Sequence, residues 1–110
     1  MVAKSLRLRA TKDMNRTLRG KKIVRDFIVV RAVPNLLKKT RIGIIVSKKV
    51  SLKAVERNRL RRCVSEAVRL ELPPPPLAGW DVVFVATPGL KGATCAAIRG
   101  TVKKLLSLLV

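Results

Sequence analysis

Apolar residues follow two different periods along this chain, and these periods predict its strands and helices. Short runs rich in β-branched residues occupy residues 26–33, 41–47 and 81–86. Runs of this length and composition, bounded by glycine, proline or asparagine, are typical of strands. The unbroken hydrophobicity of residues 41–47 indicates a strand that is largely buried. We therefore predict three clear strands, and a further strand beginning within residues 20–25.

Two other segments repeat apolar residues every three or four positions, as a helix with one buried face does. The stronger pattern predicts a helix at about residues 52–70, ended by the tetraproline at 73–76, which we expect to form a stiff connector. The second pattern predicts a C-terminal helix. The apolar positions are Leu52, Leu60, Cys63, Val64, Ala67 and Val68 in the first helix and Cys95, Ile98, Val102, Leu105 and Leu109 in the second.

The N-terminal region predicts one more helix and an arm. A short helix is expected at residues 11–19, with Met14 and Leu18 on one face. Residues 1–10 alternate basic and apolar side chains and are expected to form a flexible basic arm. The order of elements is helix, strands, helix, strand, helix, which predicts a single α+β layer domain over residues 1–110.

Charge narrows the choice of partner. The chain has 25 Lys and Arg against 6 Asp and Glu, a formal net charge of +19, while its 48% hydrophobic residues predict a folded chain. Such an excess of positive charge calls for a polyanion, either nucleic acid or an anionic membrane. Because each neutralised phosphate releases counterions, we expect binding to nucleic acid to weaken steeply as salt rises.

The sequence argues against a membrane partner. The longest apolar runs, at residues 82–86 and 105–110, fall far short of the roughly 20 residues that a spanning helix requires. Residues 1–19 are basic but contain neither an apolar core nor a small-residue cleavage site, so they do not resemble a secretory signal. We therefore expect a cytoplasmic protein that binds nucleic acid.

Cysteine usage predicts no metal site. Cys63 and Cys95 are isolated in the sequence, no Cys-x-x-Cys motif occurs, and the chain has no His. The ligands of a zinc site are therefore missing. Both cysteines lie on the apolar stripes of predicted helices, so we expect ordinary core residues whose thiols are reduced, as is usual in the cytoplasm.

The densest group of basic residues follows the strand at 41–47 and continues along the long predicted helix. Arginine can hold two phosphate oxygens at once, lysine supplies a point charge, and an asparagine amide can bond a phosphate, a 2′-hydroxyl or a base edge. We call this group the basic cluster and predict that it binds RNA. Its members are Lys48, Lys49, Lys53, Arg57, Asn58, Arg59, Arg61 and Arg62.

A run of charges on a helix is more often only a solvated face, and such faces normally mix both signs. The long helix has only Glu56, Glu66 and Glu71 to offset its arginines, which favours a binding surface. Arg57 and Arg59 fall at the two borders of its apolar side. The residues opposite the apolar side are Asn58, Arg61, Arg62 and Arg69.

The protein itself is poorly equipped for catalysis. It has no His, its six acids are scattered without a pair suited to acid–base work or metal binding, and no Gly-rich phosphate loop follows a strand. We predict no catalytic and no metal-binding residue. Stacking platforms for RNA bases are also scarce, because Phe27 and Phe84 are expected in the core and Trp80 in packing.

Residues 41–69 read Arg-Ile-Gly-Ile-Ile-Val-Ser-Lys-Lys-Val, then Lys-Ala-Val-Glu-Arg-Asn-Arg-Leu-Arg-Arg, then Ser-Glu-Ala-Val-Arg. This segment closely resembles the bacterial ribonuclease P protein component, in which a strand ends in Ser-Lys-Lys-Val and a helix bears the signature Arg-Asn-Arg. Residues 12–20 resemble the first helix of that family, and residues 79–89 resemble its last strand and Pro-Gly turn. The likeness covers nearly the whole chain.

The resemblance implies an α-β-β-β-α-β-α two-layer fold with a left-handed β-α-β crossover, although such crossovers are nearly always right-handed. It also implies a mechanism. The RNA subunit and Mg²⁺ ions, bound mainly by that RNA, cleave precursor tRNA to leave its mature 5′ end. The protein lies on the catalytic RNA, assists metal binding and holds the 5′ leader in a cleft between the first helix and the sheet. No obligatory protein partner is implied.

By match to the motif, Arg57, Asn58 and Arg59 would contact the catalytic RNA, with the three lysines of the basic cluster nearby. This chain departs from the family where aromatics are usual. In the first helix the corresponding residues are Met14 and Leu18, in a later strand Val30, and at the end of the Arg-Asn-Arg helix Val68. Residues 50–52, Val-Ser-Leu, also replace the glycine that follows Lys-Lys-Val in many members.

Two other classes of function remain open at this point. A small basic ribosomal protein without a role in tRNA processing would have the same size and charge, although the spacing from Lys-Lys-Val to Arg-Asn-Arg argues against it. A nucleoid protein or other binder of double-stranded DNA would also be basic. Competition between structured RNA and duplex DNA separates that class from an RNA-binding protein.

Overall fold

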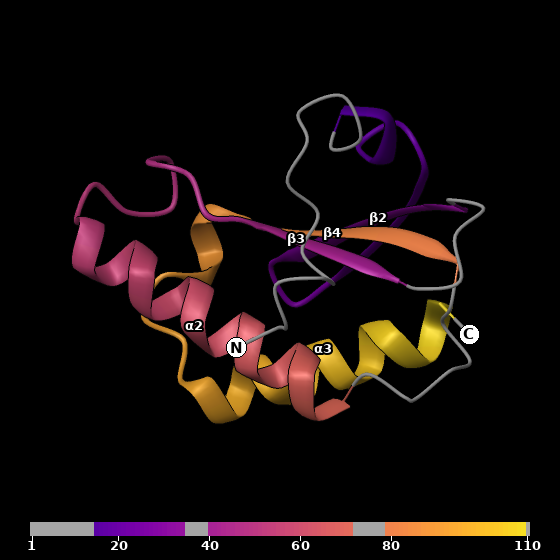
Figure 1. Ribbon diagram of the computed structural model, residues 1–110. Coiled ribbons are helices and arrows are strands. Elements are labelled where there is room, and N and C mark those ends of the chain that lie inside the picture. Colours follow the sequence, from indigo (N-terminus) through magenta and orange to yellow (C-terminus); the bar gives the residue numbers. More distant parts are fainter. Residues whose placement is uncertain (1–14, 35–39, 72–78, 110) are drawn as a thin grey trace.

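The computed structural model describes residues 15–34, 40–71 and 79–109, and the structural statements below concern these residues. They form two layers, a four-stranded sheet and two long helices packed on one of its faces (Figure 1). The elements are β1 (Lys21–Arg25), β2 (Ile28–Pro34), β3 (Arg41–Ile45), α2 (Ala54–Glu71), β4 (Trp80–Ala86), the 3-10 helix η2 (Pro88–Leu90) and α3 (Cys95–Leu109).

The sheet order is β1-β2-β4-β3, so the last strand in the sequence lies inside the sheet. β2 pairs antiparallel with both β1 and β4, whereas β3 and β4 are parallel. Parallel neighbours need a crossover connection, and α2 supplies it between β3 and β4. The crossover is left-handed (Figure 1), as the predicted fold class requires and against the general rule of chirality.

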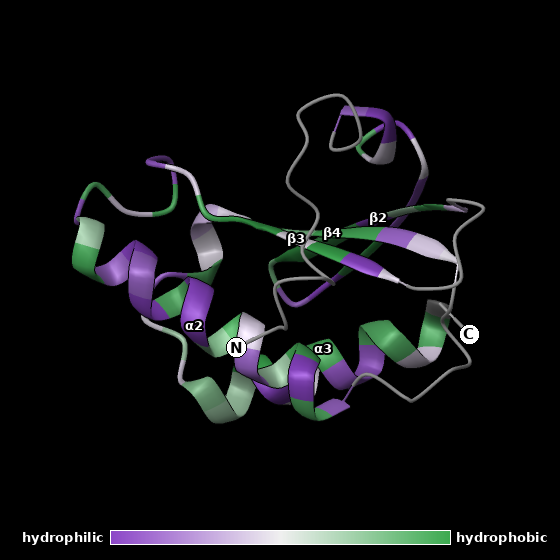
Figure 2. Ribbon diagram, in the orientation of Figure 1, coloured by the Kyte–Doolittle hydropathy of each residue, from purple (hydrophilic) through white to green (hydrophobic). Residues whose placement is uncertain are grey.

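The core lies between the sheet and the two helices, where the apolar residues of both layers meet (Figure 2). Alternate side chains of a strand point to one face, and every second residue from Ile28 to Ala32 in β2 and from Val82 to Ala86 in β4 points toward the helices. The helical stripes that the sequence predicts are buried against them, apart from Leu52 and Cys95 and leaving aside Leu109, whose side chain lies outside the described part of the structure. Full burial of such a side chain stabilises the fold by about 1.5–3 kcal/mol. The buried helix residues are Leu60, Cys63, Val64, Ala67, Val68, Ile98, Val102, Leu105 and Leu106.

Neither α2 nor α3 covers the other face of the sheet, which we call the outer face. It consists of the strand residues that alternate with the core positions, and residues 15–20 stand on this side (Figure 1). Residues 15–17 of this segment are helical, and Thr17 is completely buried. The members of the outer face are Lys22, Val24, Val29, Arg31, Val33, Arg41, Gly43, Ile45, Asp81, Val83 and Val85.

The turn between β1 and β2 corrects two expectations. Asp26 and Phe27 have positive φ angles of 45° and 69° and form a two-residue hairpin turn, so the prediction that the strand begins at Asp26 was wrong. Phe27 is 58% exposed rather than buried, and its carbonyl accepts hydrogen bonds from the Thr87 amide and hydroxyl at 3.0 and 2.8 Å. The usual Asn-Gly signal of such a turn is missing, which is why the sequence did not reveal it.

The other two aromatic residues lie where the sequence predicts them, since Phe84 is buried and Trp80 packs against the core. Leu52 is 83% exposed because α2 begins only at Ala54, so its predicted place on the buried side was wrong. The arm at 1–10, the start of the first helix and the tetraproline lie outside the described residues. None of the described helices is long and apolar enough to cross a membrane.

Candidate RNA interface

Lys48 and Lys49 lie in the turn that follows β3, and both are exposed. The turn is held from within, because the Val50 amide donates to the Ser47 carbonyl at 3.0 Å and the Lys49 amide lies 3.3 Å from the Ser47 hydroxyl. Val50 is buried in the core and anchors the turn against the rest of the fold. The two lysines are therefore presented to solvent from an ordered backbone.

The entrance to α2 brings two further members of the basic cluster to the same end of the helix. The Lys53 amide donates to the Ser51 hydroxyl at 3.2 Å just before the helix begins. One guanidinium nitrogen of Arg57 donates to the carbonyls of Ser51 and Leu52 at 3.0 and 3.1 Å. Arg57 thus fixes the loop to the helix, and its other guanidinium donors make no hydrogen bond to the described residues.

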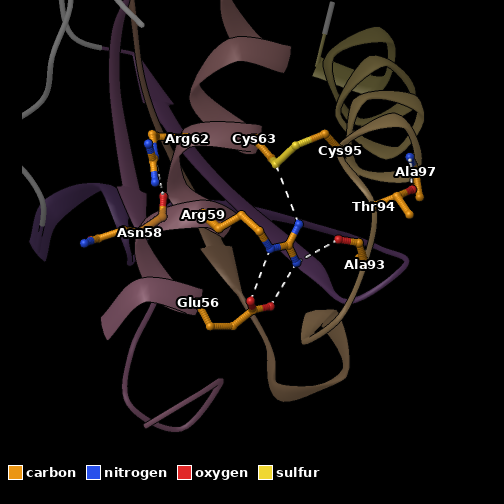
Figure 3. Close-up of a disulfide and its surroundings, with 9 residues drawn as sticks. All are labelled: Glu56, Asn58, Arg59, Arg62, Cys63, Ala93, Thr94, Cys95 and Ala97. Atoms are coloured by element: carbon orange, nitrogen blue, oxygen red, sulfur yellow. Dashed lines mark hydrogen bonds and ion pairs between the residues drawn. A yellow bond between two sulfur atoms is a disulfide. The ribbon is translucent and has the colours of Figure 1, made fainter. Parts of the chain in front are cut away.

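Asn58 is the next member of the basic cluster along this side of the helix, and Arg61 and Arg62 follow it about one turn later. The Asn58 side-chain oxygen accepts a hydrogen bond from Arg61, and the Arg62 guanidinium lies 3.5 Å from the Asn58 carbonyl, a weak contact. Figure 3 shows Asn58 and Arg62 on the side of α2 away from Cys95. With Arg57 these residues form what we call the open stripe. No carboxylate among the described residues pairs with it.

Arg59 lies at the other border of α2 and is used differently. Its guanidinium donates to both carboxylate oxygens of Glu56, at 3.1 and 2.9 Å, and to the Ala93 carbonyl before α3, at 2.9 Å (Figure 3). The hydrogen bond from Arg59, and then that from the Gly92 amide, lowers the pKa of Glu56, while the same bond to Glu56 raises the pKa of Arg59. Arg59 therefore joins α2 to the segment that leads into α3.

A disulfide between Cys63 and Cys95 lies beside Arg59 (Figure 3). The expectation of two reduced core thiols was wrong, and Cys95 is exposed although Cys63 is buried. The cause is tertiary. The two helices pack together and bring positions 32 residues apart to a Cα–Cα distance of 5.1 Å, well within disulfide range. No local pattern in the sequence could show that proximity.

The side of α2 that faces α3 also collects most of the acids of this region. Glu66 pairs with Arg69, which holds the pKa of that carboxyl at about 2, and Arg99 of α3 pairs with Glu71 at 2.8 Å. One member of each of the three pairs, Arg59, Glu66 or Arg99, lines a hollow with an apolar floor. We call this the junction side of α2. The arginines of its three pairs are offset by carboxylates, whereas those of the open stripe are not, although Arg62 of the stripe also lines the hollow and Arg69 extends from the same helix face as Asn58 and Arg62.

Comparison with known proteins identifies the family. A family model described as ribonuclease P matches residues 2–110. The chain belongs to the ribonuclease P protein family. It is 39% identical over 87 residues to the ribonuclease P protein component of Clostridioides difficile, covering 79% of this chain and 75% of that one. It is 40% identical over 103 residues to that of Dehalococcoides mccartyi, covering 93% and 82%.

Solved structures of ribonuclease P proteins have the same fold. That from Staphylococcus aureus superposes with a TM-score of 0.84 at 25% identity, covering 96% of each chain. That from Thermotoga maritima gives a TM-score of 0.79 at 28% identity, covering 93% of this chain and 96% of the other. The predicted α+β fold class and the family resemblance are both confirmed.

Within this ribonuclease P protein, two of the positions that differ from the family's aromatics are deeply buried. Val30 and Val68 both have no exposed surface and face the core, so neither can reach RNA. In β2 it is Val29 and Arg31, not Val30, that belong to the outer face. Leu18 is half-buried on the segment above that face, and Met14 lies outside the described residues.

The sequence analysis missed a second group of basic residues in this ribonuclease P protein. Lys22, Arg31 and Arg41 all lie on the outer face, and Arg31 donates to the Gly20 carbonyl at 3.2 Å. The signal was present only in part, since Arg31 stands between apolar neighbours in β2, whereas Lys22 follows Lys21 and Arg41 follows Thr40. It went unread because the basic residues are spread over three strands rather than gathered in one run.

Proposed function

We propose that this protein is the protein subunit of ribonuclease P, and that it binds the catalytic RNA and the 5′ leader of precursor tRNA. The observation that supports this most strongly is the family match over residues 2–110. The alternative of a ribosomal protein without a role in tRNA processing has no observation in its favour.

The catalytic RNA binds the open stripe and the exposed lysines that precede it. These cations have no carboxylate partner among the described residues, so each can neutralise a phosphate without first breaking an ion pair. The helix and the braced loop hold them in place before RNA arrives, which reduces the entropy lost on binding. Arg59 contributes by holding the helix in position against α3, with its guanidinium already bound to Glu56 and Ala93.

The leader of precursor tRNA binds on the outer face of the sheet. Val29, Val33 and Val85, which are partly exposed, supply an aliphatic surface there, and Lys22 and Arg31 supply positive charge for the phosphates. The described outer-face residues include no aromatic ring, because Phe84 and Trp80 point to the core side. Without stacking platforms or a row of polar groups for base edges, the contacts are made to the backbone and tolerate different leader sequences.

The chemistry belongs to the RNA subunit. Among the described residues no three His, Cys, Asp or Glu side chains gather to hold a metal ion, so these side chains do not fit a protein site for Mg²⁺. In this proposal Mg²⁺ is bound mainly by the RNA, and the protein supplies positive charge and positioning. The enzyme acts in the cytoplasm and needs no other protein.

Reconstitution tests the proposal. The full-length protein is mixed with a bacterial ribonuclease P RNA, and cleavage of precursor tRNA is followed at low Mg²⁺. We expect the protein to raise the cleavage rate at the mature 5′ end, and RNA-free protein to cleave nothing. Cleavage by the protein alone, or no effect of the protein on the RNA, contradicts the proposal.

Salt and competitor controls define the interface. If the basic cluster neutralises about five to eight phosphates, affinity for the RNA should fall by orders of magnitude between roughly 50 and 200 mM salt. Duplex DNA should compete poorly with the structured RNA. A flat salt titration would show that the charge of the open stripe is incidental, and equal competition by duplex DNA would favour a general nucleic-acid binder.

A further inference from the structure

Asp81 is a completely buried carboxylate on the outer face, at the start of β4. Arg41, its register partner on β3, donates from Nε to one carboxylate oxygen at 2.8 Å and from Nη2 to the other at 2.7 Å. A buried charge is tolerated only when it is paired and hydrogen-bonded, and this two-point contact meets that need within the sheet.

A second guanidinium reaches the same carboxylate from outside the sheet. Arg16 Nη2 donates to Asp81 at 2.8 Å across 65 positions of sequence, and Arg16 Nη1 donates to the Pro34 carbonyl at the end of β2 at 3.1 Å. One planar side chain thus joins residues 15–17 to two strands at once. Its side chain remains 47% exposed, so its contact with Asp81 is at the edge of the buried region.

Further contacts hold residues 15–20 at the same end of the sheet. Thr17 is completely buried, and Arg31 of β2 donates to the Gly20 carbonyl at 3.2 Å. Gly20 lies so close to β2 that a Cβ atom there would overlap the Ala32 carbonyl. The segment is therefore fixed at its Gly20 end by backbone proximity, and nearer its helical turn by the Arg16 contacts to Asp81 and Pro34.

We propose that Asp81 is a positioning residue for precursor tRNA, acting through Arg16. The Asp81 carboxylate holds the Arg16 guanidinium. The guanidinium in turn fixes the position and orientation of residues 15–20 relative to the outer face, on which the leader binds. This inference rests on the proposed function, since it concerns the leader of a ribonuclease P substrate. Asp81 is completely buried, so we expect it to act on leader binding through the guanidinium groups that it holds, and Arg16 is the one that connects it to residues 15–20.

The competing explanation is that Arg16 simply adds one positive charge near the leader. Arg16→Lys separates the two, because it keeps the charge but cannot donate in the plane to both Asp81 and the Pro34 carbonyl. Arg99→Lys is the matched control. Arg99 is 54% exposed, forms an ion pair with Glu71 at 2.8 Å, and lies on α3 across the sheet from the outer face.

The experiment uses holoenzyme reconstituted with a bacterial ribonuclease P RNA. Dissociation constants are measured for precursor tRNA with its leader and for tRNA without it, together with kcat at saturating substrate. Arg16→Lys should weaken binding of the leader-bearing substrate by about tenfold and leave leaderless tRNA and kcat unchanged. Hydrogen exchange at the amides of residues 19 and 20, which bond to the Arg16 and Thr17 carbonyls, should become faster in this variant. Arg99→Lys should match the wild type in every measurement.

Asp81→Asn should reproduce the loss of leader binding and the faster exchange if it folds, and Arg16→Lys tests the proposal on its own if it does not. Wild-type leader affinity and exchange in Arg16→Lys would overturn the positioning role while leaving the proposed function intact. A wild-type holoenzyme that binds both substrates equally well would overturn the leader site and this inference together.

Discussion

Arg57 and Arg59 lie two residues apart in one signature, yet they belong to different parts of the molecule. Arg57 closes the loop before α2 and belongs to the open stripe, where no described carboxylate offsets the positive charge. Arg59 belongs to the junction side, where Glu56 and the Ala93 carbonyl occupy its guanidinium. The difference shows that the arginines of one motif can have different surroundings: at one border of the helix no described carboxylate pairs with the arginine, and at the other the arginine joins α2 to the segment before α3.

Loss of the core beneath α2 should affect both borders at once and give the largest effect on stability. Leu60 has no exposed surface, so Leu60→Ala should lower the free energy of unfolding by about 2–5 kcal/mol. Leu52→Ala is the matched control, because Leu52 is 83% exposed and its removal should change stability by less than about 0.5 kcal/mol. Urea unfolding followed by circular dichroism measures both, and similar losses in the two variants would mean that α2 is not seated as described.

Removal of the disulfide should separate the two borders by loosening only the junction side. The bond joins residues 32 positions apart, so Cys63→Ser combined with Cys95→Ser should lower the free energy of unfolding by about 2–4 kcal/mol. RNA affinity at 25 °C should stay close to that of the wild type while the variant remains folded. Thermal melts with and without reductant check this, since reduction should lower the melting temperature of the wild type and not that of the double variant. Alkylation of both cysteines in unreduced native protein would show free thiols instead.

Arginines of α2 with and without a carboxylate partner should respond differently to removal. Arg61 belongs to the open stripe, so Arg61→Ala should weaken binding to the catalytic RNA by about 1–3 kcal/mol. Arg69→Ala removes the same charge from a guanidinium that Glu66 already offsets, and should change RNA affinity by less than about 0.5 kcal/mol. RNA titrations at one fixed salt concentration compare them. Equal losses would mean that net charge alone matters, and that the division of the helix has no bearing on binding.

Acid should weaken the ion pair between Glu66 and Arg69, and its effect on the free energy of unfolding should be the smallest of the series. The hydrogen bond from Arg69 lowers the pKa of Glu66 from 4.5 to about 2 in the folded protein. The stability that this pair contributes is therefore fully present above pH 4.5 and is lost as pH falls toward 2, because the unfolded chain takes up the proton first. Glu66→Gln should flatten the fall of unfolding free energy over that interval. An unchanged pH profile in this variant would show that the pair adds nothing to stability.

The parts of the molecule that the sequence predicted are those set by local repetition. The buried side of α2 follows from apolar residues three and four positions apart, and the placement of Arg57 and Arg59 at its borders follows from the same geometry. The Asp81 contacts join residues 40 and 65 positions apart, and the role of Arg59 depends on where Ala93 lies in space. Such contacts depend on the packing of distant elements, which periodicity does not encode.

The candidate interface was predicted in composition more fully than in arrangement. The eight members of the basic cluster were chosen by residue type and density, and their contacts with RNA stay a prediction. The structure adds that they divide between the open stripe with its lysines and the junction side. The left-handed crossover was available only through the family resemblance, because nothing in the pattern of β3, α2 and β4 fixes its hand.

The position of β4 within the sheet has a consequence for folding during synthesis on the ribosome. β2 and β3 do not pair with each other. The strand that joins them in the sheet is β4, which comes later in the sequence and ends at Ala86. A nascent chain that has released β1, β2, β3 and α2 has therefore made its arginine-rich helix before the platform that will seat it. Until β4 has been made, α2 therefore lacks the complete sheet against which its apolar side is buried.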